Sequence, residues 1–221
     1  MSKPEDDAPT PVEDQLTKPI EGVPQDISRV IGAAATLELH GSPSLAQSAL
    51  EIARSKLGQK EPDRKGHPNE GEIVRWALEG LTSREPGPWA SWCAFFVCQC
   101  VRQALIAAGA DALTIRDWRK TYASGSCTSL WHRLDSAGLA IRHSPSQPIP
   151  EGACFVFFGG DKTHDDGKIE LSLEHVGIYD RCAGELILTI EGNASATADR
   201  VAEGKHMITN PRVWGFGLLP Y

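Results

Sequence analysis

Residues 174–193 read EHVGIYDRCAGELILTIEGN and decide the fold of the second half of the chain. Apolar residues alternate with other residues on both sides of a glycine, which is typical of two antiparallel strands. Cys182, Ala183 and Gly184 are expected to form a three-residue loop, because the glycine can adopt the left-handed backbone that such loops require. The stretch therefore predicts a β-hairpin.

This loop determines which residues face each other across the hairpin. With three loop residues, His175 lies directly opposite Glu191, and opposed Cβ atoms are about 4.5–5.5 Å apart. A carboxylate at that distance can orient an imidazole, and period-two alternation puts Asn193 on the same face. A polar pair on a solvated face would explain the pattern equally well. Five apolar residues are expected to point the other way into a core: Val176, Ile178, Leu186, Leu188 and Ile190.

Helical patterns precede the hairpin, and strand patterns surround it. Five segments show apolar residues at helical spacing: 45–57, 70–81, 91–109, 114–122 and 129–137. Four short runs are rich in β-branched or aromatic residues: 153–158, 175–179, 186–190 and 213–218. Helices followed by strands predict an α+β domain with an antiparallel sheet over residues 45–221.

The first 44 residues differ in composition from the rest. They hold eight acidic and three basic residues, six of the fifteen prolines, and no aromatic residue. Such a segment has little to bury, so it predicts an acidic, proline-rich and largely mobile tail. A weak amphipathic helix over residues 26–34 is the exception. It would serve as a strut on the domain or as a docking or export segment.

Composition excludes several functional classes. The 221 residues include 22 Lys and Arg against 29 Asp and Glu, a formal net charge of −7, with no basic stripe to neutralise nucleic-acid phosphates. No apolar run is long enough to cross a bilayer, so no membrane insertion is expected. Six cysteines are too few to form a disulfide scaffold, and none forms a C-x-x-C pair. Most are expected to be reduced core residues.

Cys93 has a distinctive position at the start of the helix predicted over 91–109. The positive end of a helix dipole and its free N–H groups favour a thiolate, and the same groups can stabilise an oxyanion. Alone, a cysteine on an apolar helix is more often a core residue. Together with His175 and Glu191, however, it completes a set of nucleophile, base and orienting group.

Short sequence boxes around these residues resemble one family. Residues 92–97 read WCAFFV, 175–179 read HVGIY, 191–193 read EGN, and 150–156 read PEGACFV before a strand. In this order they resemble the CHAP family (cysteine, histidine-dependent amidohydrolases/peptidases) and its NlpC-type relatives, over residues 45–221. The resemblance implies a papain-like fold with the catalytic cysteine at a helix N-terminus.

The resemblance also implies an activity, namely cleavage of amide bonds in bacterial peptidoglycan. The bond would lie within the stem peptide or between N-acetylmuramic acid and L-alanine. By position in the boxes, Cys93 would be the nucleophile, His175 the base and then the acid, and Glu191 the residue that orients His175. Asn193 would polarise the site, or replace Glu191 if the register differs. No cofactor is expected.

Two departures from the family concern the edges of the site. Glu174 stands where the family usually has glycine, and it would narrow the cleft or bind a charged substrate group. Residues 82–92 hold one acid, Glu85, so the calcium site of some CHAP enzymes is not expected and no metal is predicted.

Trp92 is placed in the substrate groove, although such tryptophans also pack beneath a helix. Residues 161–167 are expected to form an acidic loop.

The N-terminal sequence shows no apolar export signal, so synthesis in the cytoplasm is expected. A wall hydrolase would then act at the cell wall or periplasm after lysis, as a phage lysin does, or after injection as an antibacterial effector. An effector would have an immunity protein and a secretion-apparatus protein as partners. The alternatives are a cytoplasmic cysteine amidase with a non-wall substrate and a catalytically silent papain-like binding module.

Overall fold

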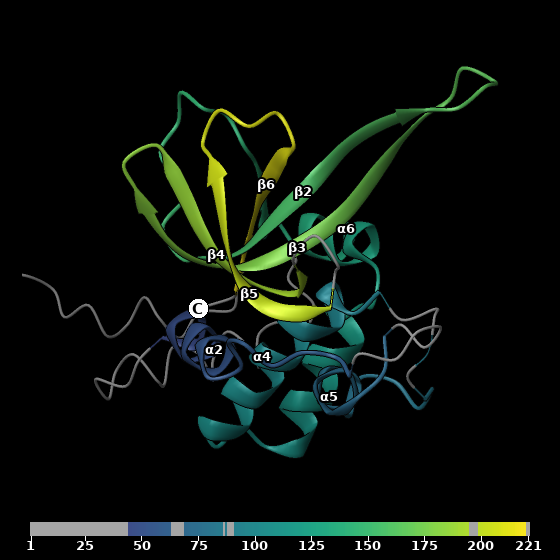
Figure 1. The fold of residues 1–221 in the computed structure, drawn as a ribbon, viewed down its shortest axis with the longest axis vertical. Helices are drawn as coiled ribbons and strands as arrows, with labels where there is room; N and C mark the ends of the chain where they lie inside the picture. Colours follow the sequence, from purple (N-terminus) through teal and green to yellow (C-terminus); the bar gives the residue numbers. More distant parts are fainter. Residues whose placement is uncertain (1–43, 63–68, 86, 88–90, 195–198, 220–221) are drawn as a thin grey trace, which may run out of the picture.

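The computed structural model describes residues 44–62, 69–85, 87, 91–194 and 199–219. Within these ranges the chain forms five helices and one six-stranded antiparallel sheet, and the helices gather on one side of the sheet (Figure 1). This confirms the expected α+β class.

The predicted tail lies almost entirely outside the described residues. This applies to residues 1–43 and to the weak helix expected over 26–34. Ser44, the last residue of the predicted tail, accepts a hydrogen bond from the backbone N–H of Gln47 and caps the first described helix. The first described helix therefore begins where the helix signal begins.

The helices lie within or close to the segments expected from apolar spacing. They are α2 (Leu45–Arg54), α3 (Glu72–Leu78), α4 (Cys93–Ala107), α5 (Ala112–Thr121) and α6 (Cys127–Ser136). Asp111 and Ser126 cap α5 and α6 through their side-chain oxygens. After α4 ends, Gly109 takes a φ of +75°, which glycine adopts without a Cβ clash. The longest helix, α4, carries Cys93 at its first position.

The sheet has the strand order β1-β6-β2-β3-β4-β5. Its strands are β1 (Ala140–Arg142), β2 (Ala153–Thr163), β3 (Ile169–Ala183), β4 (Leu186–Ala194), β5 (Arg200–Met207) and β6 (Val213–Leu218). Apolar patterns do not predict β1 and β5. β1 has only three residues, and Val201 is the only residue of β5 that is buried. β5 is nevertheless important, since it lies beside β4 and carries a residue of the site.

β2 and β3 extend beyond the strands expected from the sequence. The expected acidic loop at 161–167 is wrong in part, because β2 continues through Thr163 and pairs there with Ile169 of β3. The paired strands form a long arm that projects from the body of the protein (Figure 1). Backbone pairing therefore stabilises a polar segment whose composition resembles that of a loop.

The β3–β4 hairpin forms, but its expected register is wrong. Ala183 pairs with Leu186, so the loop consists of Gly184 and Glu185, with Gly184 at φ +61°. A β-bulge at Asp180 then adds one residue to β3. As a result, Tyr179 pairs with Thr189 rather than with Ile187, and His175 does not lie directly opposite Glu191.

The bulge nevertheless brings His175 and Glu191 to the same face of the sheet. Without it, the pairing of Ala183 with Leu186 would continue with no interruption and would turn Glu191 to the opposite face from His175. One extra residue restores the alternation, and the two side chains meet diagonally. The predicted contact thus forms through a different register.

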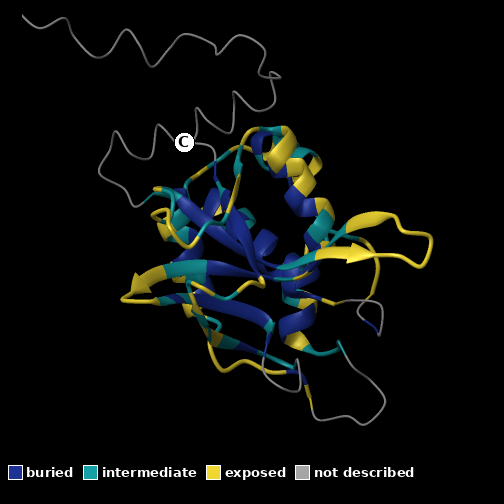
Figure 2. Ribbon diagram, turned by 90° about the horizontal axis from the view of Figure 1, so that it is seen from above, coloured by how far each residue is buried: buried dark blue, intermediate teal, exposed yellow. Residues whose placement is uncertain are grey.

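Apolar residues pack on both faces of the sheet. The larger cluster lies between the sheet and the helices and includes Val176, Ile178 and Ile190, as expected, whereas Leu186 and Leu188 are half-buried. A smaller cluster on the other face is centred on Val156, Phe158, Ile187, Val213 and Phe216. Figure 2 shows buried residues through the centre of the molecule and exposed residues at its loops and strand ends. The helix with Cys93 is thereby fixed against β3 and β4.

The described cysteines are all free thiols. Cys98, Cys100 and Cys154 are fully buried in the core, and burial raises the pKa of the Cys98 thiol to about 12. Cys182, in the β3–β4 hairpin, is exposed. Cys93 and Cys127 differ from these four because they lie side by side.

Candidate active site

Cys93 occupies the first position of α4, where the backbone N–H groups have no partners within the helix. The helix begins when the Trp92 carbonyl accepts a hydrogen bond from the Phe96 N–H at 2.8 Å. The positive end of this 15-residue helix favours the thiolate form of Cys93. The cysteine is 2% exposed, so its immediate neighbours decide its chemistry.

One of these neighbours is a second thiol. The Sγ atoms of Cys93 and Cys127 are 3.6 Å apart, and Cys127 is the first residue of α6. The hydrogen bond with Cys127 is the main cause that holds the pKa of Cys93 well below the usual thiol range, and His175 and Ser91 add to it against burial. The same contact raises the pKa of Cys127. These opposite directions favour Cys93 as the thiolate and Cys127 as the thiol that donates to it.

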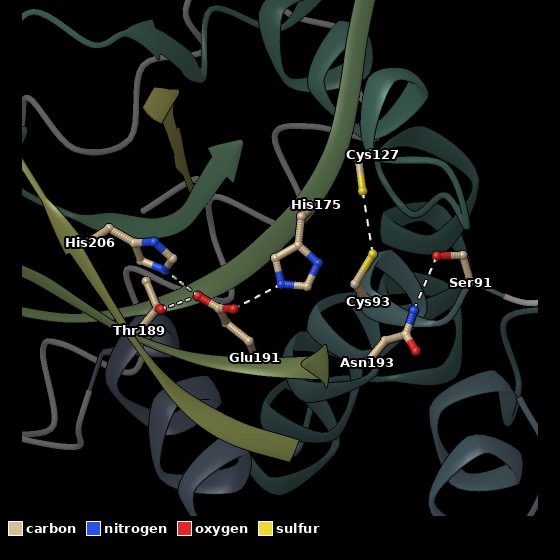
Figure 3. A network of polar contacts seen from close by, with 8 residues as sticks. All are labelled: Ser91, Cys93, Cys127, His175, Thr189, Glu191, Asn193 and His206. Atoms are coloured by element: carbon tan, nitrogen blue, oxygen red, sulfur yellow. Dashed lines mark hydrogen bonds and ion pairs between the residues drawn. The ribbon is translucent and has the colours of Figure 1, made fainter. Parts of the chain in front are cut away.

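His175 lies between Cys93 and Glu191 (Figure 3). Its Nε2 contacts Glu191 Oε2 at 2.9 Å, and its other ring nitrogen faces Cys93. Burial alone would lower the pKa of His175, but hydrogen bonds with Cys93 and Glu191 outweigh it and raise the pKa to about 10. The site thus favours a thiolate next to an imidazolium.

Glu191 is the anion on the other side of His175, so that Cys93, His175 and Glu191 lie in a row. Its side chain is 8% exposed, and its two oxygens accept from different donors. Oε2 accepts from His175, while Oε1 accepts from His206 Nε2 at 2.6 Å and from Thr189 Oγ1 at 2.5 Å. Burial would raise the pKa of Glu191, but these hydrogen bonds hold it below its usual range.

Glycines on the two neighbouring strands make room for the Glu191 side chain. A Cβ at Gly177 of β3 would lie 2.8 Å from Glu191 Cγ, and a Cβ at Gly204 of β5 would lie 2.0 Å from Glu191 Oε1. Real Cβ atoms do not approach so closely, so any larger residue would displace the carboxylate. The position of Glu191 is therefore built into three adjacent strands.

Asn193 does not orient His175. Its backbone takes a φ of +56°, so it leaves the regular alternation of the strand, and its Nδ2 donates to Ser91 Oγ at 3.2 Å. Glu191, and not Asn193, contacts the imidazole. Although the register differs from the expected one, Asn193 does not replace Glu191 as the orienting residue, and its expected part in polarising the site stays a prediction. The residue instead ties the end of β4 to the segment that precedes Cys93 (Figure 3).

Trp92 is a packing residue, which corrects its expected place in the substrate groove. Its side chain is fully buried, and its indole N–H donates to Glu61 Oε1 at 2.6 Å. Its ring meets Phe96 edge to face. It anchors the start of α4 from below and has no surface to offer a substrate.

Glu174 lies at the outer edge of the site. It is exposed and forms an ion pair with Arg212 at 2.5 Å. Arg212 borders a cavity of about 280 Å³ next to the imidazole. The cavity is lined by Phe158, His175, Glu191, Asn193, Ala194, His206, Asn210 and Arg212. Glu174 therefore forms a charged pair at the rim of this cavity, and its expected role in narrowing the cleft or binding a charged substrate group stays a prediction.

Sequence reasoning missed three residues of this site. Thr189 alternates with Glu191 along β4, so period two would have placed it on the same face. His206 belongs to β5, which lacks a clear strand pattern. Cys127 starts a short helix and resembles any small core residue in sequence. Only the three-dimensional structure brings Cys127 to Cys93 and His206 to Glu191.

Two histidines and a carboxylate also occur together in metal sites, but the geometry differs here. Each histidine Nε2 is directed at an oxygen of Glu191 rather than at a shared point. Among the described residues, no group of three or more His, Cys, Asp or Glu is arranged to hold a metal ion. The polar contacts within the row account for its arrangement.

Comparisons with models of protein families, with curated proteins and with solved structures find no match to this chain. The resemblance to the CHAP family therefore remains a prediction from the sequence boxes. Within the described part of the chain, no helix combines the length and the apolarity required to cross a bilayer.

The chemistry available to the site follows from the order of its groups, with His175 between Cys93 and Glu191. A thiolate at a helix N-terminus can attack a carbonyl carbon, and the imidazolium beside it can donate a proton. The buried carboxylate holds the imidazolium by its other nitrogen. This arrangement is suited to acyl transfer through a thioester.

Proposed function

We propose that the protein is a cysteine-dependent amidohydrolase or peptidase that cleaves an amide bond in peptidoglycan. The observation that carries this proposal is the position of His175, with one ring nitrogen toward Cys93 and the other 2.9 Å from Glu191. The nucleophile comes from α4, whereas the base and the orienting group come from the β3–β4 hairpin, which lies well after α4 in the sequence.

The reaction begins from the thiolate–imidazolium pair. Cys93 Sγ attacks the amide carbonyl, forming a C–S bond, and backbone N–H groups at the start of α4 stabilise the oxyanion. His175 gives its proton to the nitrogen of the leaving amine as the C–N bond breaks. The neutral imidazole then takes a proton from water, whose oxygen attacks the thioester. The acid product leaves, and the thiolate and imidazolium are restored.

The substrate class rests on the sequence boxes. The WCAFFV box lies at the start of α4, HVGIY lies on β3, and EGN lies at the end of β4. This order supports a papain-like arrangement, in which a helix N-terminus faces an antiparallel sheet. The stem peptide and the bond between N-acetylmuramic acid and L-alanine are the amides to test. Delivery by injection or by phage-like lysis, with an immunity protein for an effector, belongs to the same proposal.

The test is digestion of purified peptidoglycan by the wild type, Cys93→Ala and His175→Ala. We expect the wild type to release fragments, and each variant to lose about 10³-fold or more in rate while melting at a similar temperature. Mass spectrometry of the fragments identifies the bond. As a second arm, each protein is directed to a bacterial periplasm, where only the wild type should cause lysis.

The other outcomes have definite meanings. Intact peptidoglycan combined with rapid alkylation of Cys93 by iodoacetamide would overturn the wall substrate and indicate an amidase with another substrate. Intact peptidoglycan with an unreactive Cys93 would indicate a silent binding module. Equal activity in all three proteins would remove the assigned nucleophile and base.

A further inference from the structure

His206 is a second histidine bound to the carboxylate that orients His175. It lies on β5, on the side of Glu191 away from β3. Its Nε2 is 2.6 Å from Glu191 Oε1, and its side chain is 22% exposed. Glu191 is thus shared by two imidazoles, with one on each oxygen (Figure 3).

The neighbourhood of His206 is shaped for this contact. Its ring lies 4.2 Å from the ring of Phe158, measured between centroids, and Phe158 also approaches His175 at 6.0 Å. Gly204, two residues earlier on β5, leaves the space into which Glu191 Oε1 projects. The N–H of His206 therefore reaches Glu191 Oε1, with the ring of Phe158 packed against the imidazole and with space left by Gly204.

The contact restrains the rotation of the carboxylate. A carboxylate held by one oxygen can turn about its last bond, whereas Glu191 is held by His175 on Oε2 and by His206 and Thr189 on Oε1. Because the imidazole of His175 is in turn fixed by Oε2, any turn of Glu191 changes the direction of His175 toward Cys93. In metal sites, loss of a group that holds a functional histidine in its orientation costs about 10- to 100-fold in activity, and the same geometric argument applies to Glu191 and His175.

We propose that His206 is a positioning residue, which holds Glu191 so that His175 stays directed at Cys93 in a row of Cys93, His175, Glu191 and His206. This inference rests on the proposed function for its effect on turnover, but the geometry that it describes is testable without a substrate. His206 acts through Glu191 and is not assigned contact with the reacting atoms.

The charged surroundings of this row are defined. Glu191 faces His175 from β3 and His206 from β5, with Thr189 as its neutral neighbour on β4. Cys93 approaches His175 from α4, and Arg212, paired with Glu174, borders the same cavity. Removing the donor at 206 while keeping a ring there therefore leaves the other charges in place.

Two substitutions separate the donor of His206 from its ring. His206→Phe keeps a ring against Phe158 but removes the donor, whereas His206→Gln keeps an amide N–H near the position of Nε2 and removes the ring. We expect His206→Phe to lower kcat about 10- to 100-fold with KM within twofold. His206→Gln should retain most of kcat. His164→Phe, at an exposed histidine on the arm, is the matched control and should behave as wild type.

A spectroscopic measurement tests the geometry directly. The low-field imidazole N–H proton of His175, bound to Glu191, is followed by NMR in each folded protein. It should be present in the wild type, His206→Gln and His164→Phe, and lost or broadened in His206→Phe. A wild-type signal together with wild-type kcat in His206→Phe would overturn the inference.

The design also covers two other results. If His206→Phe does not fold, His206→Asn takes its place, because its shorter amide does not reach Glu191 Oε1, and the same comparison with His206→Gln decides. If the wild type leaves peptidoglycan intact while the N–H signal changes as expected, the proposed substrate fails and the role of His206 stands. If the signal does not change, His206 does not position Glu191.

Discussion

Two His–Glu pairs in this protein have the same 2.9 Å distance between nitrogen and oxygen but opposite surroundings. His175 and Glu191 lie in the body of the sheet, with side chains 23% and 8% exposed. His164 and Glu170 lie on the β2–β3 arm, with side chains 43% and 72% exposed. The two pairs are equal in distance but differ in their chemistry.

The difference comes from water and from further partners. Water screens the arm pair, and exposed ion pairs of this kind contribute little to stability. The buried pair lies at low effective dielectric, with a second histidine and a threonine on the carboxylate and a thiolate beyond the imidazole. Burial and third partners, rather than the distance between the pair, distinguish a candidate catalytic contact from a surface contact.

The largest effect that sharpens this comparison is expected from a matched change of both carboxylates. Glu191→Gln replaces an anion with a neutral amide that can turn its NH₂ toward His175, so kcat should fall about 100-fold. Glu170→Gln makes the same change on the arm and should leave kcat unchanged. Digestion rates on one substrate preparation compare the two. Equal rates for both variants would mean that burial does not distinguish the pairs.

A smaller effect is expected from a change that removes no polar group. Gly204→Ala puts a methyl group where Glu191 Oε1 lies, so the carboxylate must shift and kcat should fall about tenfold. Gly160→Ala, on the arm side of β2, meets no atom within 4 Å and serves as control. Thermal melts check that both variants fold. Full activity in a folded Gly204→Ala protein would contradict a fixed carboxylate.

The sequence predicts those parts of the molecule that depend on local patterns. Apolar spacing predicts the helix that begins at Cys93, and period two in 186–190 predicts the strand that carries Glu191. Alternation places residues 175 and 177 on one face of β3, and residues 189 and 191 on one face of β4. Those two faces coincide only because the loop and the bulge together set the pairing, so the expected contact forms although the expected register is wrong.

The remainder depends on contacts between distant segments. The bulge residue Asp180 pairs with Arg54 of α2 at 2.5 Å, a partner that no local pattern of the hairpin includes. His206 belongs to a largely polar strand that forms beside β4, and Cys127 reaches Cys93 only because α6 packs near α4. Such pairings follow from tertiary packing, so spacing along the chain does not reveal them.

The smallest expected effect concerns pH and separates attack from proton donation. In the proposed reaction His175 must be protonated to release the amine, and its pKa is raised to about 10. As pH rises through 10, the imidazolium is lost, so kcat/KM for amide cleavage should fall to half at the midpoint. Alkylation of Cys93 by iodoacetamide needs only the thiolate and should not fall over that range. As pH decreases below the depressed pKa of Cys93, both rates should fall together.

His164→Ala should give wild-type curves, because the arm pair lies outside the row. An activity limb near the ordinary histidine value of 6.5, with no limb at high pH, would mean that the buried pair does not hold the charge on His175 and that the two pairs are alike after all.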